Sequence, residues 1–261
     1  MADKNNEQNR AVWNEIVELH YEHPDYKLKE FLDGWNSLKE IERNALGDVT
    51  DKSLLHLMCQ FGMDTLSWAR LGADVTGVDI SDKSIEYAEK LKQLAGFPDA
   101  QFIRSDIYDL IGKLDKKFDI IFQSHGTHCW IEDLDKWAEV IAHYLKPGGT
   151  FFIVDSHPIV DLFLWDDEFS YFHKGPYKET GSPDYCDRTY KIKNESVEWM
   201  HQISDFVNVM IKAGLTIEYL QEFNKGYYDV KGDWVRKGDY WYPPEGAPKY
   251  PLMFALKATK K

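Results

Sequence analysis

The sequence predicts an α/β fold in which helices cover both faces of a mostly parallel sheet of seven strands. From residue 53 onward, short apolar runs alternate with longer amphipathic segments, a pattern typical of βαβ units. Two more strand-like segments follow near the end of the chain, and their order indicates a hairpin that closes the sheet. The sequence shows no internal repeat or low-complexity tract that would favour a solenoid.

The central segment supplies five of these strands. We expect strands over residues 54–58, 74–78, 100–103, 118–123 and 150–154. Helices are expected between them, over residues 64–71, 82–95 and 134–145. The last helix should end at Lys146-Pro147-Gly148-Gly149, because proline and glycine disfavour its continuation.

The flanking segments differ from this core. Val12, Ile16 and Leu19 recur at helical spacing and predict a helix over 8–20 that ends before Pro24. Residues 157–195 show no sustained period, which favours a lid or a binding element. A helix over 197–213 and strands over 215–223 and 252–258 should follow.

These segments predict a single domain over 1–261. Its parts are a helical cap (1–50), a core of βα units (51–156), an insertion or lid (157–196), and a C-terminal helix and hairpin (197–261).

Composition narrows the class of partner. The net charge of −13 disfavours nucleic acid, whose phosphates are held by clusters of Lys and Arg. The cysteines Cys59, Cys129 and Cys186 are odd in number and lack metal-type spacing, so we expect reduced thiols, no metal and a cytoplasmic location. A polar N-terminus and the lack of a long apolar run indicate a chain that does not enter a membrane. We expect the protein to be a monomer or a homodimer.

Two strand ends indicate a nucleoside-type ligand. In doubly wound sheets, ligands bind beyond the carboxyl ends of the strands, where the turn ending at Gly62 would lie. Asp79 follows the second strand, 17 residues after Gly62, and a carboxylate there can accept hydrogen bonds from both ribose hydroxyls. Asp79 could instead cap the next helix, but Ser81 is an equally good cap and leaves Asp79 free.

Further motifs follow in order: Asp106 after the third strand, the segment 118–126, and Leu145-Lys146-Pro147-Gly148-Gly149 before the fifth strand. Together with the turn and Asp79, they resemble the class I, Rossmann-like S-adenosylmethionine-dependent methyltransferases. That class usually has an acidic residue at position 56 and glycine at 58, 60 and 62. Here these positions hold His56, Met58, Gln60 and Gly62, which resembles a variant first motif of a bacterial subgroup.

The resemblance implies that S-adenosylmethionine is the cofactor. Asp79 would bind its ribose, Asp106 would accept from the adenine amino group, and Ile107 would pack on the ring. The complete set implied for the cofactor is His56, Cys59, Phe61, Gly62, Asp79, Ile80, Ser81, Ser105, Asp106, Ile107, Gln123 and Ser124.

Methyl transfer to an oxygen or nitrogen atom of a small molecule is therefore the expected activity. It needs an aligned nucleophile and, if that nucleophile starts protonated, a base. We expect His125, at the end of the fourth strand, to be that base, although a neutral histidine hydrogen-bonded into the structure is the competing interpretation. The acceptor is expected to contact His128, Trp130, His157 and Tyr171.

Two other functions stay open at this point. The altered first motif would also suit a non-catalytic protein that binds S-adenosylmethionine or its demethylated product. An NAD-dependent oxidoreductase shares the architecture but needs a glycine-rich turn for pyrophosphate, which Met58, Gln60 and Phe61 crowd.

Overall fold

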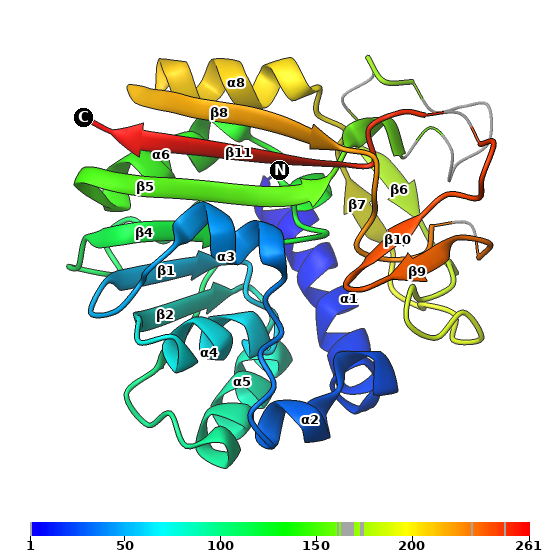
Figure 1. Ribbon diagram of the computed structural model, residues 1–261, viewed down its shortest axis with the longest axis horizontal. Coiled ribbons are helices and arrows are strands. Elements are labelled where there is room, and N and C mark those ends of the chain that lie inside the picture. Colours follow the sequence, from blue (N-terminus) through cyan, green and yellow to red (C-terminus); the bar gives the residue numbers. More distant parts are fainter. Residues whose placement is uncertain (1, 161, 163–169, 173–174, 231, 248) are drawn as a thin grey trace.

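The centre of the computed structural model, which describes residues 2–160, 162, 170–172, 175–230, 232–247 and 249–261, is a seven-stranded sheet (Figure 1). Its strand order is β3-β2-β1-β4-β5-β11-β8, and β11 alone runs antiparallel to its neighbours β5 and β8. This confirms the predicted mostly parallel sheet and its C-terminal hairpin. The strands are β1 (Ser53–Leu57), β2 (Asp74–Asp79), β3 (Gln101–Arg104), β4 (Phe118–Gln123), β5 (Leu145–Ser156), β8 (Leu215–Phe223) and β11 (Met253–Lys260).

Helices cover both faces of this sheet, as predicted. Helices α3 (Glu40–Leu46), α4 (Met63–Arg70), α5 (Asp82–Ala95), α6 (Leu134–Tyr144) and α8 (Ile203–Lys212) pack on the sheet, whereas α1 (Ala2–Glu22) and α2 (Leu28–Leu32) contact α5. Short 3₁₀ turns are η1 (Pro24–Tyr26), η2 (His128–Trp130) and η3 (Pro158–Val160). Because successive strand residues face opposite sides, Leu55 and Leu57 pack with α6 and α8, whereas Leu54 packs with α4 on the other face.

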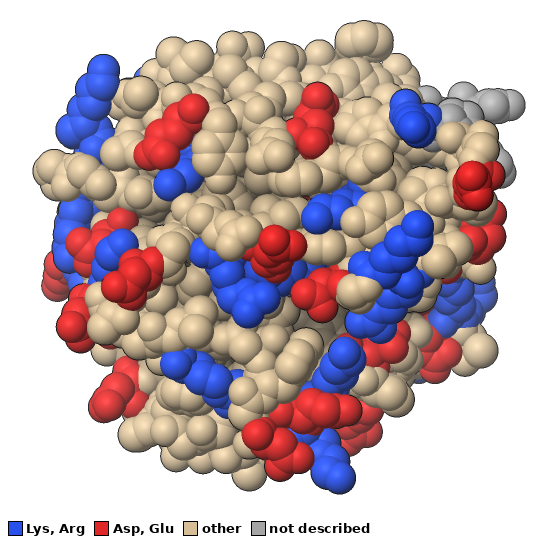
Figure 2. Space-filling view, viewed as in Figure 1, with Lys and Arg blue, Asp and Glu red and all other residues tan. Residues whose placement is uncertain are grey.

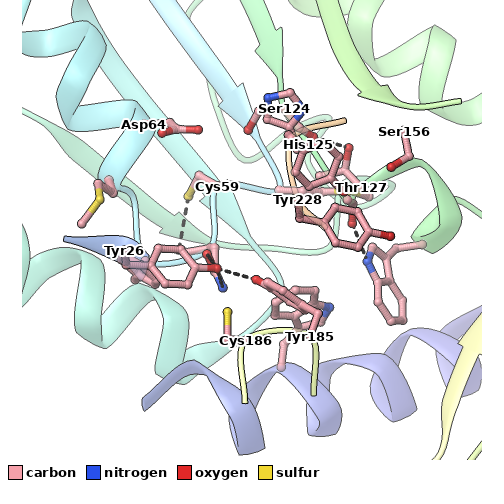
Figure 3. A pocket seen from close by; sticks show the side chains of 18 of the residues that line it. Tyr26, Cys59, Asp64, Ser124, His125, Thr127, Ser156, Tyr185, Cys186 and Tyr228 are labelled. Carbon is pink, nitrogen blue, oxygen red and sulfur yellow. Dashed lines mark hydrogen bonds between the residues drawn. The ribbon is translucent and has the colours of Figure 1, made fainter. Parts of the chain in front are cut away.

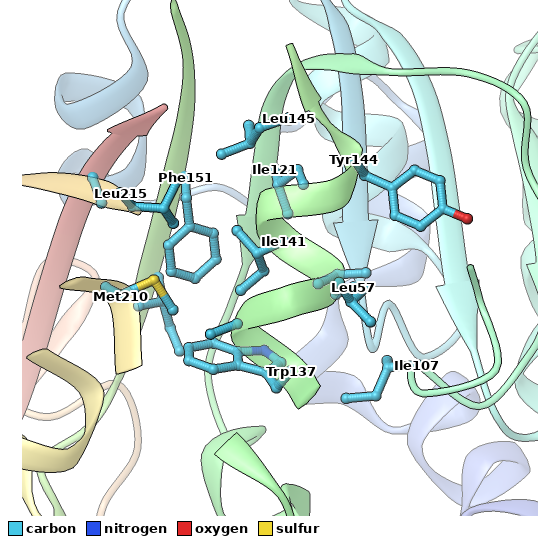
Figure 4. Close-up of a cluster of buried hydrophobic side chains, with 14 of the residues drawn as sticks. Leu57, Ile107, Ile121, Trp137, Ile141, Tyr144, Leu145, Phe151, Met210 and Leu215 are labelled. Carbon is cyan, nitrogen blue, oxygen red and sulfur yellow. The ribbon is translucent and has the colours of Figure 1, made fainter. Parts of the chain in front are cut away.

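The face under α6 and α8 forms one apolar cluster (Figure 4). Trp137 and Ile141 of α6 pack against Phe151 of β5, and Met210 of α8 lies beside them. Trp137 is fully buried, and its indole N–H donates to the side-chain oxygen of Gln123 at 2.9 Å. This tryptophan therefore packs α6 on the sheet and does not line the cavity at its carboxyl edge.

Additional segments gather at the carboxyl ends of the parallel strands. Figure 1 shows α1 and two small antiparallel sheets on the side to which β1, β2, β4 and β5 point. One small sheet pairs β6 (Tyr177–Glu179) with β7 (Ser196–Glu198), and the other pairs β9 (Val235–Lys237) with β10 (Tyr240–Tyr242). These segments enclose the edge where a ligand would bind.

The predicted helix over 197–213 is wrong in its first turn and a half. Val197 belongs to strand β7, and α8 begins only at Ile203. The side chain of Asn9 in α1 holds Val197 extended, donating to its carbonyl at 2.7 Å and accepting from its amide at 2.8 Å. Gln202 and Asp205 then form a capping box that fixes the start of α8.

The buried α6 interface yields a stability prediction. Trp137→Ala should lower the free energy of unfolding by about 3–5 kcal/mol, because it removes a fully buried ring and leaves Gln123 without its donor. Leu94→Ala on α5, where the side chain is 58% exposed, should change it by less than about 0.5 kcal/mol. Urea denaturation measures both, and a Trp137→Ala effect no larger than the Leu94→Ala effect would contradict this packing.

Candidate active site

A cavity of about 910 Å³ lies at the carboxyl edge of the sheet. Its wall is formed by the ends of β1, β2 and β4, by α1 and η1, and by residues from 185–188, 227–229 and 232–241. Figure 3 shows Tyr26, Tyr185 and Cys186 together on one side, and Ser124, His125 and Thr127 on another. Of the residues expected from the sequence, those in the wall are His56, Cys59, Phe61, Asp79, Ile80, Ser105, Asp106, Ile107, Ser124, His125, His128 and Trp130.

The turn after β1 keeps a left-handed backbone despite its missing glycines. Met58, Gln60 and Gly62 have φ angles of 55°, 51° and 76°. The first two positions carry side chains in a conformation that costs about 1–2 kcal/mol for a non-glycine residue. Gly62 could not be replaced without rearrangement, because a Cβ there would lie 2.4 Å from the ring of Phe102.

The side chain of Gln60 connects this turn to two distant segments. Its Nε2 donates to Nδ1 of His20 in α1 at 2.9 Å, and Nε2 of His20 lies 2.7 Å from Oδ2 of Asp184. Because Gln60 donates to Nδ1, the second imidazole nitrogen carries the proton and donates to the carboxylate. The turn, the N-terminal helix and the 157–196 segment are thus joined through one buried chain of hydrogen bonds.

Asp79 closes the same turn at the end of β2. Its carboxylate accepts the backbone N–H of Gln60 at 2.8 Å and that of Ser81 at 2.9 Å, which leaves lone pairs for a further donor. Burial raises the pKa of Asp79 to about 6. Ser81 caps α5 by accepting from the amide of Ser84, so Asp79 is not used as the helix cap.

Asp106 lies after β3 in the same cavity wall. Its carboxylate accepts from the side-chain amide of Asn6 in α1 and from the backbone N–H of Tyr108 at 3.0 Å. Burial raises its pKa from the ordinary range. The N-terminal helix therefore contacts the position that the resemblance assigns to adenine.

His56 is a buried residue of the cavity wall. Its Nδ1 lies 2.8 Å from the hydroxyl of Thr65 and its Nε2 lies 3.3 Å from that of Ser124. Burial lowers the pKa of His56 to about 4, so the imidazole is neutral near neutral pH. It cannot replace the negative charge that the class usually carries at this position.

The loop after β4 is held by one buried carboxylate. Asp155, at the end of β5, accepts the backbone N–H groups of Gly126, Thr127 and His128 at 2.6, 2.9 and 2.9 Å. Burial would raise its pKa, but the charge and hydrogen bond of His128 and the loop amides lower it to about 2. An ionised Asp155 thus fixes the loop that carries His125.

His125 is paired with a carboxylate from the N-terminal segment. Its Nε2 lies 2.8 Å from Oε1 of Glu42 in α3, and its ring stacks on Tyr227 with the centroids 4.3 Å apart. Burial would raise the pKa of Glu42, but the hydrogen bond and charge of His125 lower it. Among the described residues, neither Nδ1 of His125 nor Oε2 of Glu42 has a hydrogen-bond partner.

Three residues expected at the cofactor lie outside the cavity wall. Gly62 begins α4 and packs under Phe102, and Ser81 caps α5 and donates to Asn14. Gln123 uses its side chain to bond Trp137 and the hydroxyl of Thr127. These side chains support the wall and do not form its surface.

Two residues expected to contact the acceptor also lie outside it. Nε2 of His157 is 2.9 Å from Oε1 of Glu222 in β8. The hydroxyl of Tyr171 accepts the backbone N–H of Ile203 at the start of α8. Residues 161, 163–169 and 173–174 of the predicted lid lie outside the described part of the chain.

The sequence interpretation missed the side chains that come from distant segments. Glu42 is 83 residues from His125, and no spacing in the sequence relates them. Tyr26 and Tyr185 share a hydrogen bond across the cavity wall, again between segments far apart in the chain. Gln60 was noted only as a missing glycine, although its polar side chain at a position of positive φ was the available signal.

One group of possible metal ligands occurs among the described residues. His20, Asp184 and Cys186 place ligand atoms within 4.8 Å of one another. Both imidazole nitrogens of His20 already take part in hydrogen bonds, which explains this cluster without a metal. Within the described residues, none of the helices combines the length and apolarity required to cross a membrane.

Comparison with known proteins adds an independent line of evidence. Residues 55–153 match the family model described as a methyltransferase domain. A fatty-acid O-methyltransferase from Mycolicibacterium smegmatis is 29% identical over 124 residues, which cover 47% of this chain and 43% of that protein. A cypemycin N-terminal methyltransferase from Streptomyces sp is 31% identical over 110 residues, covering 41% of this chain and 43% of that one. The chain spans less than half the length of these two relatives.

The fold has relatives among solved structures. An S-adenosylmethionine-dependent methyltransferase from Mesorhizobium loti superposes with a TM-score of 0.56 at 19% identity, covering 88% of this chain and 100% of that one. The matched segment 55–153 runs from within β1 to within β5 and includes Asp79 and Asp106. Residues 55–153 are therefore similar to methyltransferase domains, and the chain shares the fold of solved S-adenosylmethionine-dependent methyltransferases.

Proposed function

We propose that the chain binds S-adenosylmethionine and transfers its methyl group to an oxygen or nitrogen atom of a small molecule. The observation that carries this proposal is that Asp79 and Asp106 line the same cavity as His125. The proposed nucleoside site and the candidate base thus share one cavity. Lys and Arg side chains are interspersed with Asp and Glu over the face in Figure 2, which favours a small acceptor over a polyanion.

The residues of the wall fit this cofactor. The carboxylates of Asp79 and Asp106 retain lone pairs for ribose hydroxyls and the adenine amine. Ile80, Ile107 and Phe61 offer apolar surface for the purine. The acidic side chains in the wall also favour a cation, and the bound cofactor would supply an electrophilic methyl group on a positively charged sulfur.

The chain's own residues would provide alignment and proton removal. Asp155 fixes the loop that carries His125, so the imidazole is held in place before the acceptor binds. We propose that His125 accepts the acceptor's proton and that His128 and Trp130 contact the acceptor. Helix α1, the turn η1 and residues 185–188, which line the cavity, would help to exclude water from it.

An NAD-dependent function is disfavoured by the turn after β1. The backbone amides of Cys59, Gln60 and Gly62 donate to Val78, Asp79 and Cys59, respectively. They are therefore engaged within the protein, whereas a pyrophosphate site needs such amides free.

Removing the Asp79 charge should weaken cofactor binding. We expect Asp79→Asn to raise the Kd for S-adenosylmethionine by about 10–100-fold, the usual effect of losing hydrogen bonds to a charged group. Asp74→Asn, at the exposed start of the same strand, should leave it unchanged. Titration calorimetry with S-adenosylmethionine, S-adenosylhomocysteine and NAD makes the measurement, and tight binding of NAD alone would overturn the proposed function.

Cofactor binding should also weaken in acid. The Asp79 carboxylate, with a pKa of about 6, accepts hydroxyl donors only when ionised. The apparent Kd should therefore rise about tenfold as the pH falls from about 7 to about 5, because only the ionised fraction binds. Protonation of Asp106, whose pKa is also raised, acts in the same direction. A Kd that is constant across this range, or a dependence of undiminished size in Asp79→Asn, would contradict the assignment.

Loss of the proposed base should affect turnover and not cofactor binding. His125→Ala should lower kcat by about 100-fold or more, as expected for a lost general base. His143→Ala, an exposed histidine of α6 outside the cavity wall, is the matched control. Release of S-adenosylhomocysteine against a metabolite panel measures turnover, and full activity of His125→Ala would exclude His125 as the base. Absence of turnover by the unmodified chain with every metabolite would favour the non-catalytic alternative.

A further inference from the structure

The pair formed by Glu42 and His125 carries information about the acceptor that neither residue gives alone. Glu42 is 2% exposed, and its carboxylate contacts Nε2 of His125 at 2.8 Å. An ionised carboxylate can only accept a hydrogen bond, so the proton of a neutral His125 lies on Nε2. This leaves Nδ1 unprotonated and basic.

The unpaired atoms of this pair need an explanation. Nδ1 of His125 and Oε2 of Glu42 are buried without a hydrogen-bond partner among the described residues. Such atoms cost stability, and apolar residues in place of a buried ion pair are often neutral or stabilising. The pair is thus a poor device for stabilising the fold. A role in chemistry at the cavity wall accounts for it better.

The backbone around Glu42 keeps the carboxylate in place. The hydroxyl of Tyr240 in β10 accepts the backbone N–H of Ile41 at 3.2 Å, which attaches α3 to the β9–β10 hairpin. The opposite partner, His125, is fixed by the loop that Asp155 holds. Both members of the pair are therefore positioned before any ligand arrives.

Among the possible acceptor groups, a hydroxyl has the greatest need of a base such as Nδ1 of His125. A hydroxyl oxygen is a weak nucleophile until its proton is removed, whereas a carboxylate is already ionised near neutral pH and a neutral amine has its lone pair available. The surrounding wall contains Trp13, Trp130, Trp241 and Tyr228, which suits a flat apolar molecule. A phenol is a flat, largely apolar molecule that carries a hydroxyl group. The pKa of a phenol is also closer to that of imidazole than the pKa of an aliphatic alcohol is.

We propose that Glu42 is a positioning residue that makes Nδ1 of His125 the base for a phenolic hydroxyl acceptor. This inference rests on the methyl transfer proposed above. The O–H bond breaks as its proton passes to Nδ1. The oxygen forms a bond to the methyl carbon as the sulfur–methyl bond breaks, with that electron pair remaining on sulfur. The carboxylate of Glu42 stabilises the resulting imidazolium.

The first test compares Glu42→Gln with Glu40→Gln, an exposed glutamate of the same helix. Both full-length variants are assayed for S-adenosylhomocysteine release with phenol, catechol, para-cresol and para-nitrophenol. Glu42→Gln should lower kcat on phenol by about 10–100-fold. On para-nitrophenol, which ionises without help, the loss should be about threefold or less. Glu40→Gln should match the unmodified chain on every probe.

A second measurement does not depend on turnover. Nitrogen-15 spectra of the unmodified chain without cofactor should show neutral His125 as the Nε2–H tautomer, identified by loss of its signals in His125→Ala. A dominant Nδ1–H tautomer would overturn the proposal. Calorimetry with S-adenosylmethionine checks that Glu42→Gln still folds and binds the cofactor with an unchanged Kd.

The outcomes separate this inference from the function on which it rests. If the unmodified chain does not bind S-adenosylmethionine, the methyltransferase function itself fails. If it binds the cofactor and methylates other acceptors but none of the four phenols, the proposed acceptor class is wrong. If Glu42→Gln loses the same factor on phenol and on para-nitrophenol, or loses nothing, Glu42 does not position the base.

Discussion

The buried carboxylate of Asp155 is the interaction on which the arrangement of the site depends. It accepts three consecutive backbone amides of the loop after β4, and a fourth backbone N–H comes from Ser156. Without this acceptor, those amides would be buried and unsatisfied, and the loop would have to adopt another path. The position of His125 at the cavity wall follows from this constraint.

The two ends of the cavity are built by different parts of the chain. Asp79 and Asp106 belong to the sheet, because each follows a parallel strand whose carboxyl end meets the same edge. Glu42, Tyr26 and Tyr185 belong to segments that lie over that edge. The residues at the strand ends can therefore bind the cofactor, while the segments that lie over them supply the side chains that select the acceptor.

The altered first motif strains the backbone of the turn after β1 but adds a side chain that bonds to a distant segment. Met58 and Gln60 adopt the left-handed backbone that glycine adopts without strain. In return, the Gln60 side chain reaches His20, and His20 reaches Asp184. A glycine at this position would relieve the strain but would leave the N-terminal helix without its attachment to the turn.

The sequence by itself determined the sheet, most of its helices and the positions of Asp79 and Asp106, because local periodicity and strand ends are encoded by neighbouring residues. It could not determine the extended backbone at Val197, which the side chain of Asn9 in α1 imposes, or the placement of His157 and Tyr171 away from the cavity wall. Nor could it pair Glu42 with His125. Such pairs depend on how distant segments pack, and only the tertiary structure decides which buried polar groups meet.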